Sequence, residues 1–460
     1  MSLYTSLCSS LLFPLHEHFK RHRSVAVRQR LEAQERWPMA RLEAWRVERL
    51  KSFLTQVGKT VPYYRHLFSE IGFEPTRVSC LADLQRLPLS DKATIRAAGD
   101  TLKAEGMQNL TRYNTGGSSG EPLIFYIGKD RKSHDVGAKW RVTRWWGVDI
   151  GDPEIVVWGS PIELGTQDHL RILRDRVLRT ELLPAFEMSE VNLDRFVEKI
   201  CRRRPAMLFG YPSSLSLIAA HARARGISMD KLGIRVVFVT SERLYDEQRR
   251  IISEVFGCPV ANGYGARDAG FIAHECPNGG MHLQAEDIIV EIVDSEGCVL
   301  PAGQPGEIAV THTATQDFPF VRYRTGDIAI LSEESCSCGR TLPLLQEIQG
   351  RSTDFVVAAD GTVMHGLALI YTVRDLPGVE RFKIIQHNLF HTEVLLVTRF
   401  PFSIDSEARI VRDYKARLGE NVRIDITHVP AIAPERSGKY RYVISKVIGT
   451  ASTSGNTAHA

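Results

Sequence analysis

The sequence lacks a marked excess of charge of either sign. Its 460 residues include 58 Lys and Arg and 54 Asp and Glu, which gives a formal net charge of only +4, and the basic residues are dispersed among acidic ones. Because nucleic-acid-binding proteins typically carry a basic patch or stripe, no nucleic-acid partner is expected. Hydrophobic residues make up 43% of the chain and charged residues 24%, which is ordinary for a globular protein.

A disulfide framework and an internal repeat are also missing. The eight cysteines are spaced unevenly along a long chain, whereas disulfide-stabilised domains are short and rich in cysteine. A reducing, cytoplasmic compartment is therefore expected.

The N-terminal stretch MSLYTSLCSSLLFPLHEHFKRHRS lacks the basic start and the cleavage site of a signal peptide. Its apolar run is too short and too interrupted to span a bilayer. Two alternatives remain open: a helical segment that packs on the main body, or a helix that lies on a membrane surface, since FKRHR follows the apolar residues. The polar C-terminal stretch 449–460 is predicted to be disordered.

The loop YNTGGSSGEP at residues 113–122 lacks the marks of the common phosphate-binding motifs. No Lys-Ser or Lys-Thr follows Gly120, the spacing is not G-x-G-x-x-G, and the next segment, PLIFYIG, predicts a strand rather than a helix. Glycine nevertheless allows close approach of the backbone, and successive N–H groups can bind an anion. For this segment alone, a phosphate-binding loop and an ordinary surface turn both remain open.

Residues 203–265 alternate between strand-like and helix-like segments, which predicts a parallel sheet with crossover helices. The helix that contains SSLSLIAAHARARG is expected to be capped by Ser213 and to end at Gly226. Ligands of such sheets bind beyond the carboxyl ends of the strands. The strands here end at Tyr211, at Ser241 and at Tyr264, so the site is predicted at these positions.

The rest of the chain predicts two further parts. Residues 285–331 contain strands separated by Gly and Pro, as in antiparallel sheet, and a smaller module with a hairpin, a helix and a strand begins near residue 350. The predicted fold class is α/β, with a large N-terminal domain of parallel α/β sheets plus a small antiparallel β subdomain, and a small mobile α+β C-terminal domain.

Four further motifs follow the glycine loop in order: YGARD at 264–268, YRTGD at 323–327, GRSTD at 350–354 and SGKY at 437–440. Each alone is compatible with a turn or an exposed loop. As an ordered set, they make the chain resemble the adenylate-forming superfamily of acyl-CoA synthetases, firefly luciferase and peptide-synthetase adenylation domains. The resemblance is strongest to the phenylacetate–CoA ligase family, in the branch associated with capsular and exopolysaccharide biosynthesis, and it runs from VPYYR to SGKYRYVISK.

The resemblance implies a division into domains. Residues 1–60 would form a helical segment that packs on the main domain, 61–351 the adenylation domain with a zinc-binding insertion near 276–338, and 352–448 a C-terminal lid.

The resemblance also implies roles for the matching residues. Ser241 and Glu242 would line the adenine pocket, Tyr264 would stack on adenine, and Gly265 would leave room for it. The residues implied to hold the β- and γ-phosphates of ATP are Thr115, Gly116, Gly117, Ser118, Ser119 and Gly120.

Three more positions take their roles from the same resemblance. Asp327 would accept hydrogen bonds from the ribose hydroxyls, which suits the two oxygens of a carboxylate. Arg351 would open the hinge before the C-terminal domain, and Lys439 would reach the acyl phosphate oxygens during adenylation.

Two departures from the family's pattern bear on catalysis. Asp268 stands where the family usually places a Glu that binds Mg²⁺, and Asp is still a hard oxygen ligand suited to that ion. Thr353 stands at a hinge position that often carries Asp or Lys, which leaves the rotation of the C-terminal domain open.

Four Cys and His residues form two pairs on separated loops: Cys276 with His282, and Cys336 with Cys338. Their types suit a closed, structural Cys₃His zinc site, although the spacing is not that of a standard finger. Buried thiols and a surface His are the alternative. Similar cysteine pairs in the polysaccharide-associated branch favour zinc. His274 is a less suitable ligand, because it should lie alongside Cys276 and crowd the site.

The expected function is ATP-dependent activation of a carboxylic acid as an acyl adenylate, followed by transfer to an acceptor, most closely the thiol of CoA, in polysaccharide or secondary-metabolite biosynthesis. The alternatives are an amide-forming ligase that joins an amine to an activated sugar or amino acid, and a non-catalytic adenylate-binding scaffold. Intact Lys439 and Asp327 argue against the scaffold. The identity of the acid, the acceptor and the oligomeric state stay open. Tyr211, Trp145, Trp146 and Trp158 are candidates for either an acid pocket or the core.

Overall fold

The structure is a computed structural model of the chain. It describes residues 2–114, 123–158, 169–185, 188, 190–351, 355–361, 363–365, 367–374, 376–400, 402–433 and 441–447. The chain divides into two compact units, one made mainly of residues up to 348 and one mainly of the residues from 349 onward, with residues 326–328 grouped with the second. Within the described ranges, no helix has both the length and the apolar character needed to cross a bilayer.

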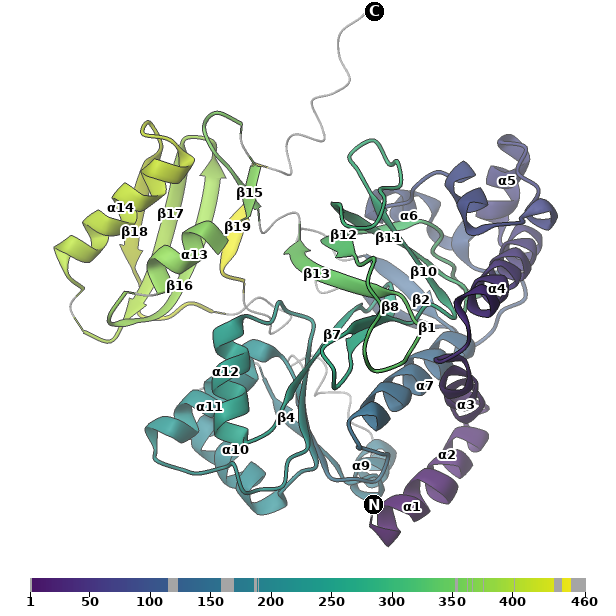
Figure 1. The fold of residues 1–460 in the computed structure, drawn as a ribbon, viewed down its shortest axis with the longest axis horizontal. Helices are drawn as coiled ribbons and strands as arrows, with labels where there is room; N and C mark the ends of the chain where they lie inside the picture. The colour runs from purple at the N-terminus through teal and green to yellow at the C-terminus, as the bar shows by residue number, and fades with distance from the viewer. Residues whose placement is uncertain are drawn as a thin grey trace, which may run out of the picture. The chain divides into compact units, whose positions relative to one another are not determined.

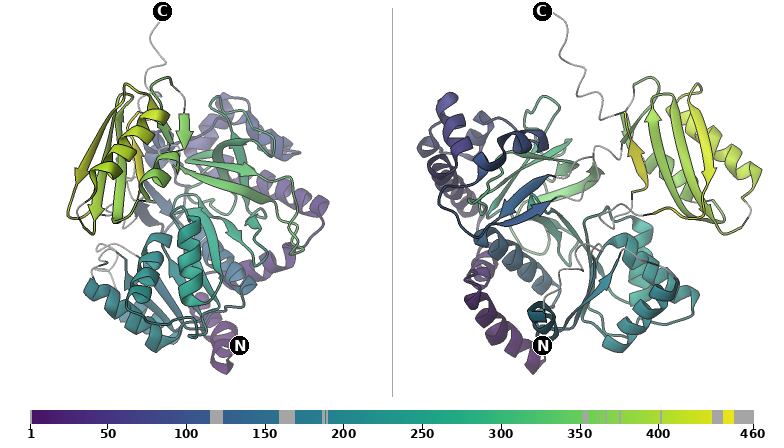
Figure 2. Two further views of the ribbon diagram at one scale, coloured as in Figure 1. Left: turned by 60° about the vertical axis from the view of Figure 1, so that its left-hand side comes forward. Right: turned by 180° about the vertical axis from the view of Figure 1, so that it is seen from behind.

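The first unit begins with helices that cover one edge of it (Figures 1 and 2). They are α1 (Leu3–Leu7), a π-helical turn (Cys8–Leu12), α2 (Phe13–Phe19), α3 (Ser24–Gln34), α4 (Met39–Thr60), α5 (Pro62–Glu70) and α6 (Lys92–Ala98), with short 3₁₀ turns at Pro75–Arg77, Leu81–Arg86 and Gly99–Leu102. The apolar stripe of α4 is buried through Leu42, Leu50 and Phe53, as expected for a helix that packs on a core.

A single large sheet forms the centre of this unit, and its strands lie in the order β10-β11-β12-β13-β9-β8-β7-β6-β5-β3-β4. The strands are β3 (Glu154–Trp158), β4 (Thr180–Pro184), β5 (Met207–Gly210), β6 (Val236–Thr240), β7 (Val260–Ala266), β8 (Gly270–Glu275), β9 (Met281–Leu283), β10 (Ile288–Val293), β11 (Pro305–His312), β12 (Tyr323–Leu331) and β13 (Leu344–Arg351).

Strands β4, β3, β5, β6 and β7 pair in parallel, whereas the pairs β7–β8, β8–β9, β9–β13 and β10–β11 are antiparallel. The predicted parallel and antiparallel parts are thus confirmed, and they are continuous in one sheet.

Helices cover both faces of the parallel part of the sheet. Figure 1 shows α10 (Glu190–Arg203), α11 (Pro212–Ala224) and α12 (Asp246–Phe256) on one side, and α7 (Lys129–Trp145) on the other. Side chains of β5 and β6 alternate accordingly: Leu208 and Val237 pack with the first three helices, whereas Phe209 and Phe238 pack with α7. Strands that are buried on both faces explain the continuous apolar runs in the sequence.

The expected cap of α11 is wrong. The helix starts at Pro212, with Tyr211 as the N-cap residue and no side-chain hydrogen bond from it. Proline suits this first position because it has no N–H group to leave unsatisfied. Ser213 therefore lies one residue inside the helix.

The remaining elements of the first unit are the antiparallel hairpin β1 (Thr111–Asn114) and β2 (Ile124–Ile127) and the helix α9 (His169–Val177). The second unit has its own sheet in the order β18-β17-β16-β19, the two-stranded pair β14–β15 and two helices. Its elements are β14 (Phe355–Val357), β15 (Val363–His365), α13 (Leu367–Arg374), β16 (Val379–Asn388), β17 (His391–Thr398), α14 (Ile404–Leu418), β18 (Arg423–His428) and β19 (Val443–Ser445). The hairpin, helix and strand expected for this module are confirmed.

Candidate functional site

The ends of β6 and β7 lie at one edge of the sheet. Thr240 of β6 pairs with Gly263 of β7, so Ser241 and Tyr264, which come next along the chain, lie at the same level. Ser241 has a φ of 72°, a left-handed conformation that is uncommon for a residue other than glycine and that recurs at functional sites. Strand β6 therefore turns sharply at Ser241 and directs the following residue away from the sheet.

That residue, Glu242, binds the start of a neighbouring helix. Its carboxylate accepts a hydrogen bond of 3.2 Å from the backbone N–H of Ser213 in the first turn of α11. A carboxylate at a helix N-terminus satisfies a free N–H group and interacts favourably with the helix dipole. Glu242 thus fixes the connection after β6 against α11; its role in an adenine pocket stays a prediction.

The YGARD and YRTGD motifs approach each other in space. The hydroxyl group of Tyr264 donates to the Thr325 hydroxyl at 3.4 Å, across 61 positions of sequence. Asp327 lies two residues after Thr325 on β12, so both side chains leave the strand on the same side, and Asp327 is only 9% exposed. The YRTGD motif lies inside strand β12 and not at a turn between strands.

Asp268 is buried in the short connection between β7 and β8. The hydroxyl group of Tyr323 donates a hydrogen bond of 2.7 Å to its carboxylate, and the guanidinium of Arg131 donates to its backbone carbonyl at 3.3 Å. Tyr323 lies in the YRTGD motif, so the sequence analysis had already singled out this segment. The sequence pattern does not show that the Tyr323 hydroxyl group faces Asp268, and no role was therefore predicted for it.

Close packing of two strands explains why position 265 is a glycine. A Cβ atom at this position would lie 2.4 Å from the carbonyl oxygen of Gly270 on the adjacent strand β8. The close approach of the two backbones therefore requires glycine, whatever lies next to it. Whether the position also leaves room for adenine stays a prediction.

Several predicted residues lie outside what the structure describes. These are the ATP-loop residues 115–120, the hinge residue Thr353 and Lys439; Arg351 is the last residue of β13, and its side chain is not described. The two ends of the loop are held by the hairpin: Asn114 of β1 pairs with Ile124 of β2. This confirms the expectation that the loop joins two strands.

The four predicted metal ligands converge. The candidate ligand atoms of Cys276, His282, Cys336 and Cys338 all lie within 4.8 Å of one another. The Cys276 and Cys336 sulfur atoms are 3.6 Å apart, and the Cys338 sulfur lies 3.2 Å from Nε2 of His282. Sheet pairing explains the meeting, because β13 pairs with β9 through Leu344 and His282 and thereby carries the preceding segment to the β8–β9 turn.

The surroundings of this Cys/His cluster hold it in place. Nδ1 of His282 lies 3.3 Å from the Leu342 carbonyl, which leaves Nε2 directed at the sulfur atoms. Arg340 packs over the Trp145 ring, and Glu35, at the end of α3, accepts one hydrogen bond from Trp145 and pairs with Arg340. Glu35 and Arg340 were not predicted, since their positions in the sequence are far apart, and Trp145 was named only as a candidate for an acid pocket or the core.

The pKa values of the cluster reflect burial and local hydrogen bonds. Burial raises the pKa of the Cys276 thiol to about 12 and lowers the pKa of His282 to about 4. Burial would also raise the pKa of Cys338, but hydrogen bonds from Arg340 and from the other two cysteines outweigh it and the pKa is lowered. A neutral imidazole and a thiolate are the forms that bind a metal ion.

His274 lies outside the cluster, as expected. Its ring stacks on Phe271, and Gln284 hydrogen-bonds its Nδ1 atom at 3.2 Å. Burial lowers its pKa to about 3, so it is a neutral core residue.

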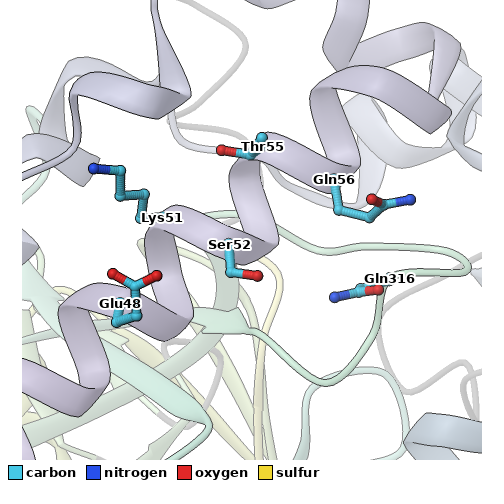
Figure 3. Close-up of a pocket in the computed structure, with 6 residues that line it drawn as sticks. All are labelled: Glu48, Lys51, Ser52, Thr55, Gln56 and Gln316. Atoms are coloured by element: carbon cyan, nitrogen blue, oxygen red, sulfur yellow. The ribbon is translucent and has the colours of Figure 1, made fainter.

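The aromatic candidates for an acid pocket also pack in the body of the protein. Trp158 stacks on the buried Tyr211 with ring centres 4.4 Å apart, and Trp146 donates to the Glu275 carbonyl. A separate polar hollow of about 430 Å³ lies between α4 and the connection after β11, and Figure 3 shows the side chains that line it. It is lined by Glu48, Lys51, Ser52, Thr55, Gln56 and Gln316, none of which is a predicted site residue.

Comparison with known proteins agrees with these motifs. The family model "AMP-binding enzyme" matches residues 182–315, and "CapK C-terminal domain" matches residues 356–446. The chain is 27% identical over 336 residues to a phenylacetate-coenzyme A ligase of Thermus thermophilus, with 70% of this chain and 73% of that protein covered. It is 23% identical over 415 residues to protein CapK of Staphylococcus aureus, with 87% and 88% covered.

The fold agrees as well. A solved structure of 2-hydroxyisobutyryl-CoA ligase in complex with 2-HIB-AMP has a TM-score of 0.71 at 21% identity, with 91% of this chain and 92% of that chain covered. Sequence matches thus cover both parts of the chain, and the fold extends over nearly all of it. By sequence, the chain is similar to AMP-binding enzymes, to phenylacetate-coenzyme A ligases and to protein CapK, and these similarities indicate an adenylate-forming ligase.

Proposed function

We propose that this enzyme uses ATP to activate a small carboxylic acid as an acyl adenylate and then transfers the acyl group to the thiol of CoA. The observation that carries the proposal is the meeting of Tyr264 with Thr325 at the carboxyl edge of the sheet. It brings the YGARD and YRTGD motifs to the position where a parallel α/β sheet binds its ligand. The relatives named as phenylacetate-coenzyme A ligases support CoA as the acceptor.

The proposed roles follow the motifs. Residues 115–120 hold the β- and γ-phosphates, Ser241 and Glu242 line the adenine pocket, and Tyr264 and Gly265 contact the adenine ring. Asp327 accepts hydrogen bonds from the two ribose hydroxyls. These groups orient ATP so that its α-phosphate faces the acid, and positioning of this kind supplies much of the rate in such reactions.

Two further residues help to balance the negative charge of the phosphates. Asp268 holds Mg²⁺, which neutralises phosphate charge when bound. Lys439 supplies a positive charge for the acyl phosphate oxygens. Residues 352–448 act as a mobile lid on an adenylation domain formed by 61–351, with Arg351 at the hinge, and the helical segment 1–60 supports that domain.

We also propose a structural zinc ion in the Cys/His cluster. Two sulfur ligands of a tetrahedral zinc ion, each about 2.3 Å from the metal, lie roughly 3.8 Å apart, and Cys276 and Cys336 are separated by 3.6 Å. The carbonyl that faces Nδ1 of His282 fixes the tautomer whose Nε2 can bind the metal. Four protein ligands leave no open position, so the ion would stabilise the fold and take no part in the reaction.

The setting we propose is the cytoplasm, in polysaccharide or secondary-metabolite biosynthesis. All eight cysteines are free, which suits a reducing compartment. The match to the CapK C-terminal domain and to protein CapK supports the polysaccharide setting.

The test is ATP–pyrophosphate exchange with a panel of aryl, fatty, amino and uronic acids. The proposal expects exchange that depends on one class of acid, and release of an acyl-CoA thioester once CoA is added. If the adenylate forms but CoA does not consume it and an amine does, the enzyme is an amide-forming ligase. If no acid supports exchange, the non-catalytic scaffold is the better reading.

A further inference from the structure

The N-terminal helices carry a row of apolar side chains on their outer side. Leu3, Leu7, Leu11, Leu15 and Phe19 recur at every fourth position and are 93, 45, 56, 48 and 77% exposed. In Figures 1 and 2, α1 and α2 run along the rim of the first unit, and no other described element of that unit covers their outer side. Five large apolar groups aligned in solvent form a patch of the kind that marks a contact surface.

The inner side of the same helices is held by specific contacts. Thr5 donates a hydrogen bond of 2.8 Å to Asp152, the Cys8 thiol faces the carbonyl of Val177, and the buried Glu17 accepts a hydrogen bond from Ser24. These contacts fix the rotation of the helices, so the apolar row is directed outward by the fold.

The π-helical turn at Cys8–Leu12 keeps the row on one side. In a regular α-helix each residue advances about 100°, so side chains four positions apart drift by roughly 40° at each step. A π-turn is wider, with hydrogen bonds between residues five positions apart, so each of its residues advances by a smaller angle and the turn offsets this drift. Placed in the middle of the segment, the turn brings the later leucines back into line with Leu3 and Leu7.

Positive charge gathers at one end of the row. Glu17 is the single acidic residue among residues 2–31 and is buried, whereas Lys20 and Arg21 are exposed. Lys129 and Lys132 of α7 lie near this end. Burial is the main cause that lowers the pKa of Lys132, and the positive charges of Lys20 and Lys129 lower it further. The surface around the row therefore offers apolar groups and cations.

We propose that this row binds the surface of a membrane that contains anionic lipids. The leucines and Phe19 would enter the boundary between headgroups and acyl chains, and Lys20 and Arg21 would contact lipid phosphate groups, as in other interfacial helices. A second copy of the chain is a poorer partner, because a symmetric contact would pair this surface with itself and would set the exposed Lys20 and Arg21 of one copy against the same cations of the other. The inference does not depend on the proposed reaction.

The test is co-sedimentation of the full chain with vesicles. The protein should bind vesicles of phosphatidylcholine mixed with phosphatidylglycerol at low salt, and bind weakly to phosphatidylcholine alone. The triple variant Leu7→Ser, Leu11→Ser, Leu15→Ser should reduce the partition coefficient by at least ~100-fold. Lys20→Gln with Arg21→Gln should reduce it by roughly fivefold for each residue, and added salt should have a similar effect.

Matched controls use exposed residues elsewhere. Val191, Phe390 and Ile404 are 60, 55 and 84% exposed, and changing all three to Ser should leave vesicle binding unchanged. Melting curves should show that both triple variants fold. The proposal fails if the native chain does not bind the mixed vesicles, or if both triple variants lose binding equally. It also fails if sedimentation without lipid shows a dimer that only the Leu7, Leu11, Leu15 variant dissociates, because a second copy then covers the row.

Discussion

Asp268 offers a test of the proposed Mg²⁺ site at the scale of a single residue. In Asp268→Asn, the amide oxygen can still accept the hydrogen bond from Tyr323, so the fold should persist. The amide loses the negative charge that binds the ion, and acid-dependent ATP–pyrophosphate exchange should fall by on the order of 100-fold. Exchange rates and melting curves, measured on the same preparation, check the two parts of this prediction.

Two variants serve as controls for Asp268. Asp268→Glu restores the ligand that the family usually has at this position and should retain most of the exchange activity. Tyr323→Phe removes the buried hydrogen bond but keeps the carboxylate, so it should lower the melting temperature more than the exchange rate. Unchanged exchange in Asp268→Asn would show that Mg²⁺ is held elsewhere.

Asp317 makes the stability of the protein depend on pH. Burial, assisted by the neighbouring Asp130 carboxylate, raises its pKa to about 6, whereas an unfolded Asp titrates near ~3.9. Between these values the folded state keeps a proton that the unfolded chain has lost. The carboxyl group is therefore best tolerated at low pH, and the free energy of unfolding should fall by up to roughly 3 kcal/mol as pH rises through this range.

The expected outcome is that Asp317→Asn raises the melting temperature at about pH 8, with a gain that disappears as pH falls below about 4. Asp130→Asn should give a smaller gain of the same sign, because it removes the second cause of the shift and leaves burial. A gain from Asp317→Asn that is equal at all pH values would contradict the assigned titration.

At the scale of elements, the Cys/His cluster joins the β8–β9 turn to the segment before β13. Gly280 lies at the contact: a Cβ atom there would come within 2.6 Å of the Cys336 sulfur. Metal analysis of protein purified without chelators should find about one zinc ion per chain. Cys336→Ser should lose the metal and lower the melting temperature, and Gly280→Ala should lower zinc retention without removing a ligand.

The control for these variants is Cys298→Ser, which changes an exposed cysteine outside the cluster. It should retain both zinc and stability. Because protons compete with the metal for the sulfur atoms, zinc should also leave as pH falls. If the native protein contains no zinc, the cluster is a set of packed thiols and an imidazole.

Local patterns predicted most of the elements near the site. The alternation of buried strands and amphipathic helices in 203–265 gave β5, α11, β6, α12 and β7 in the right order, because this pattern depends on neighbours in sequence. The requirement for Gly265 and the partner of Asp268 were not predictable, since both depend on backbones that meet from distant segments. The cap of α11 was misassigned because Ser213 is a good capping residue on propensity, and Pro212 takes the first position instead.

The outward-facing row at the N-terminus shows the same limit. The sequence shows only an interrupted apolar run there, and both packing on the body and a membrane surface remained open. The direction of the row depends on long-range contacts such as Thr5 with Asp152, which are 147 positions apart. A local pattern gives the faces of a helix, and only the fold decides which face is buried.

At the scale of the whole molecule, the chain forms two compact units, and Lys439 tests whether both are needed for the reaction. A solvated lysine in a polar loop should have little consequence: its truncation would change the free energy of unfolding by less than about 0.5 kcal/mol and leave activity intact. The family resemblance instead gives Lys439 the task of balancing charge as the carboxylate attacks the α-phosphate.

Lys439→Ala should therefore slow acid-dependent ATP–pyrophosphate exchange by about 10²–10³, the usual cost of losing one preorganised charged group, while ATP binding and melting remain near native. Lys446→Ala is the matched control, because Lys446 is an exposed lysine in the same part of the chain and should leave exchange unchanged.

Transfer from a chemically supplied acyl adenylate to CoA should survive in Lys439→Ala, since that step does not require the same charge. Slower transfer with normal exchange would assign Lys439 to the second half of the reaction. No effect on either step would mean that the second unit does not contribute this lysine to catalysis, and the scaffold alternative would then gain support.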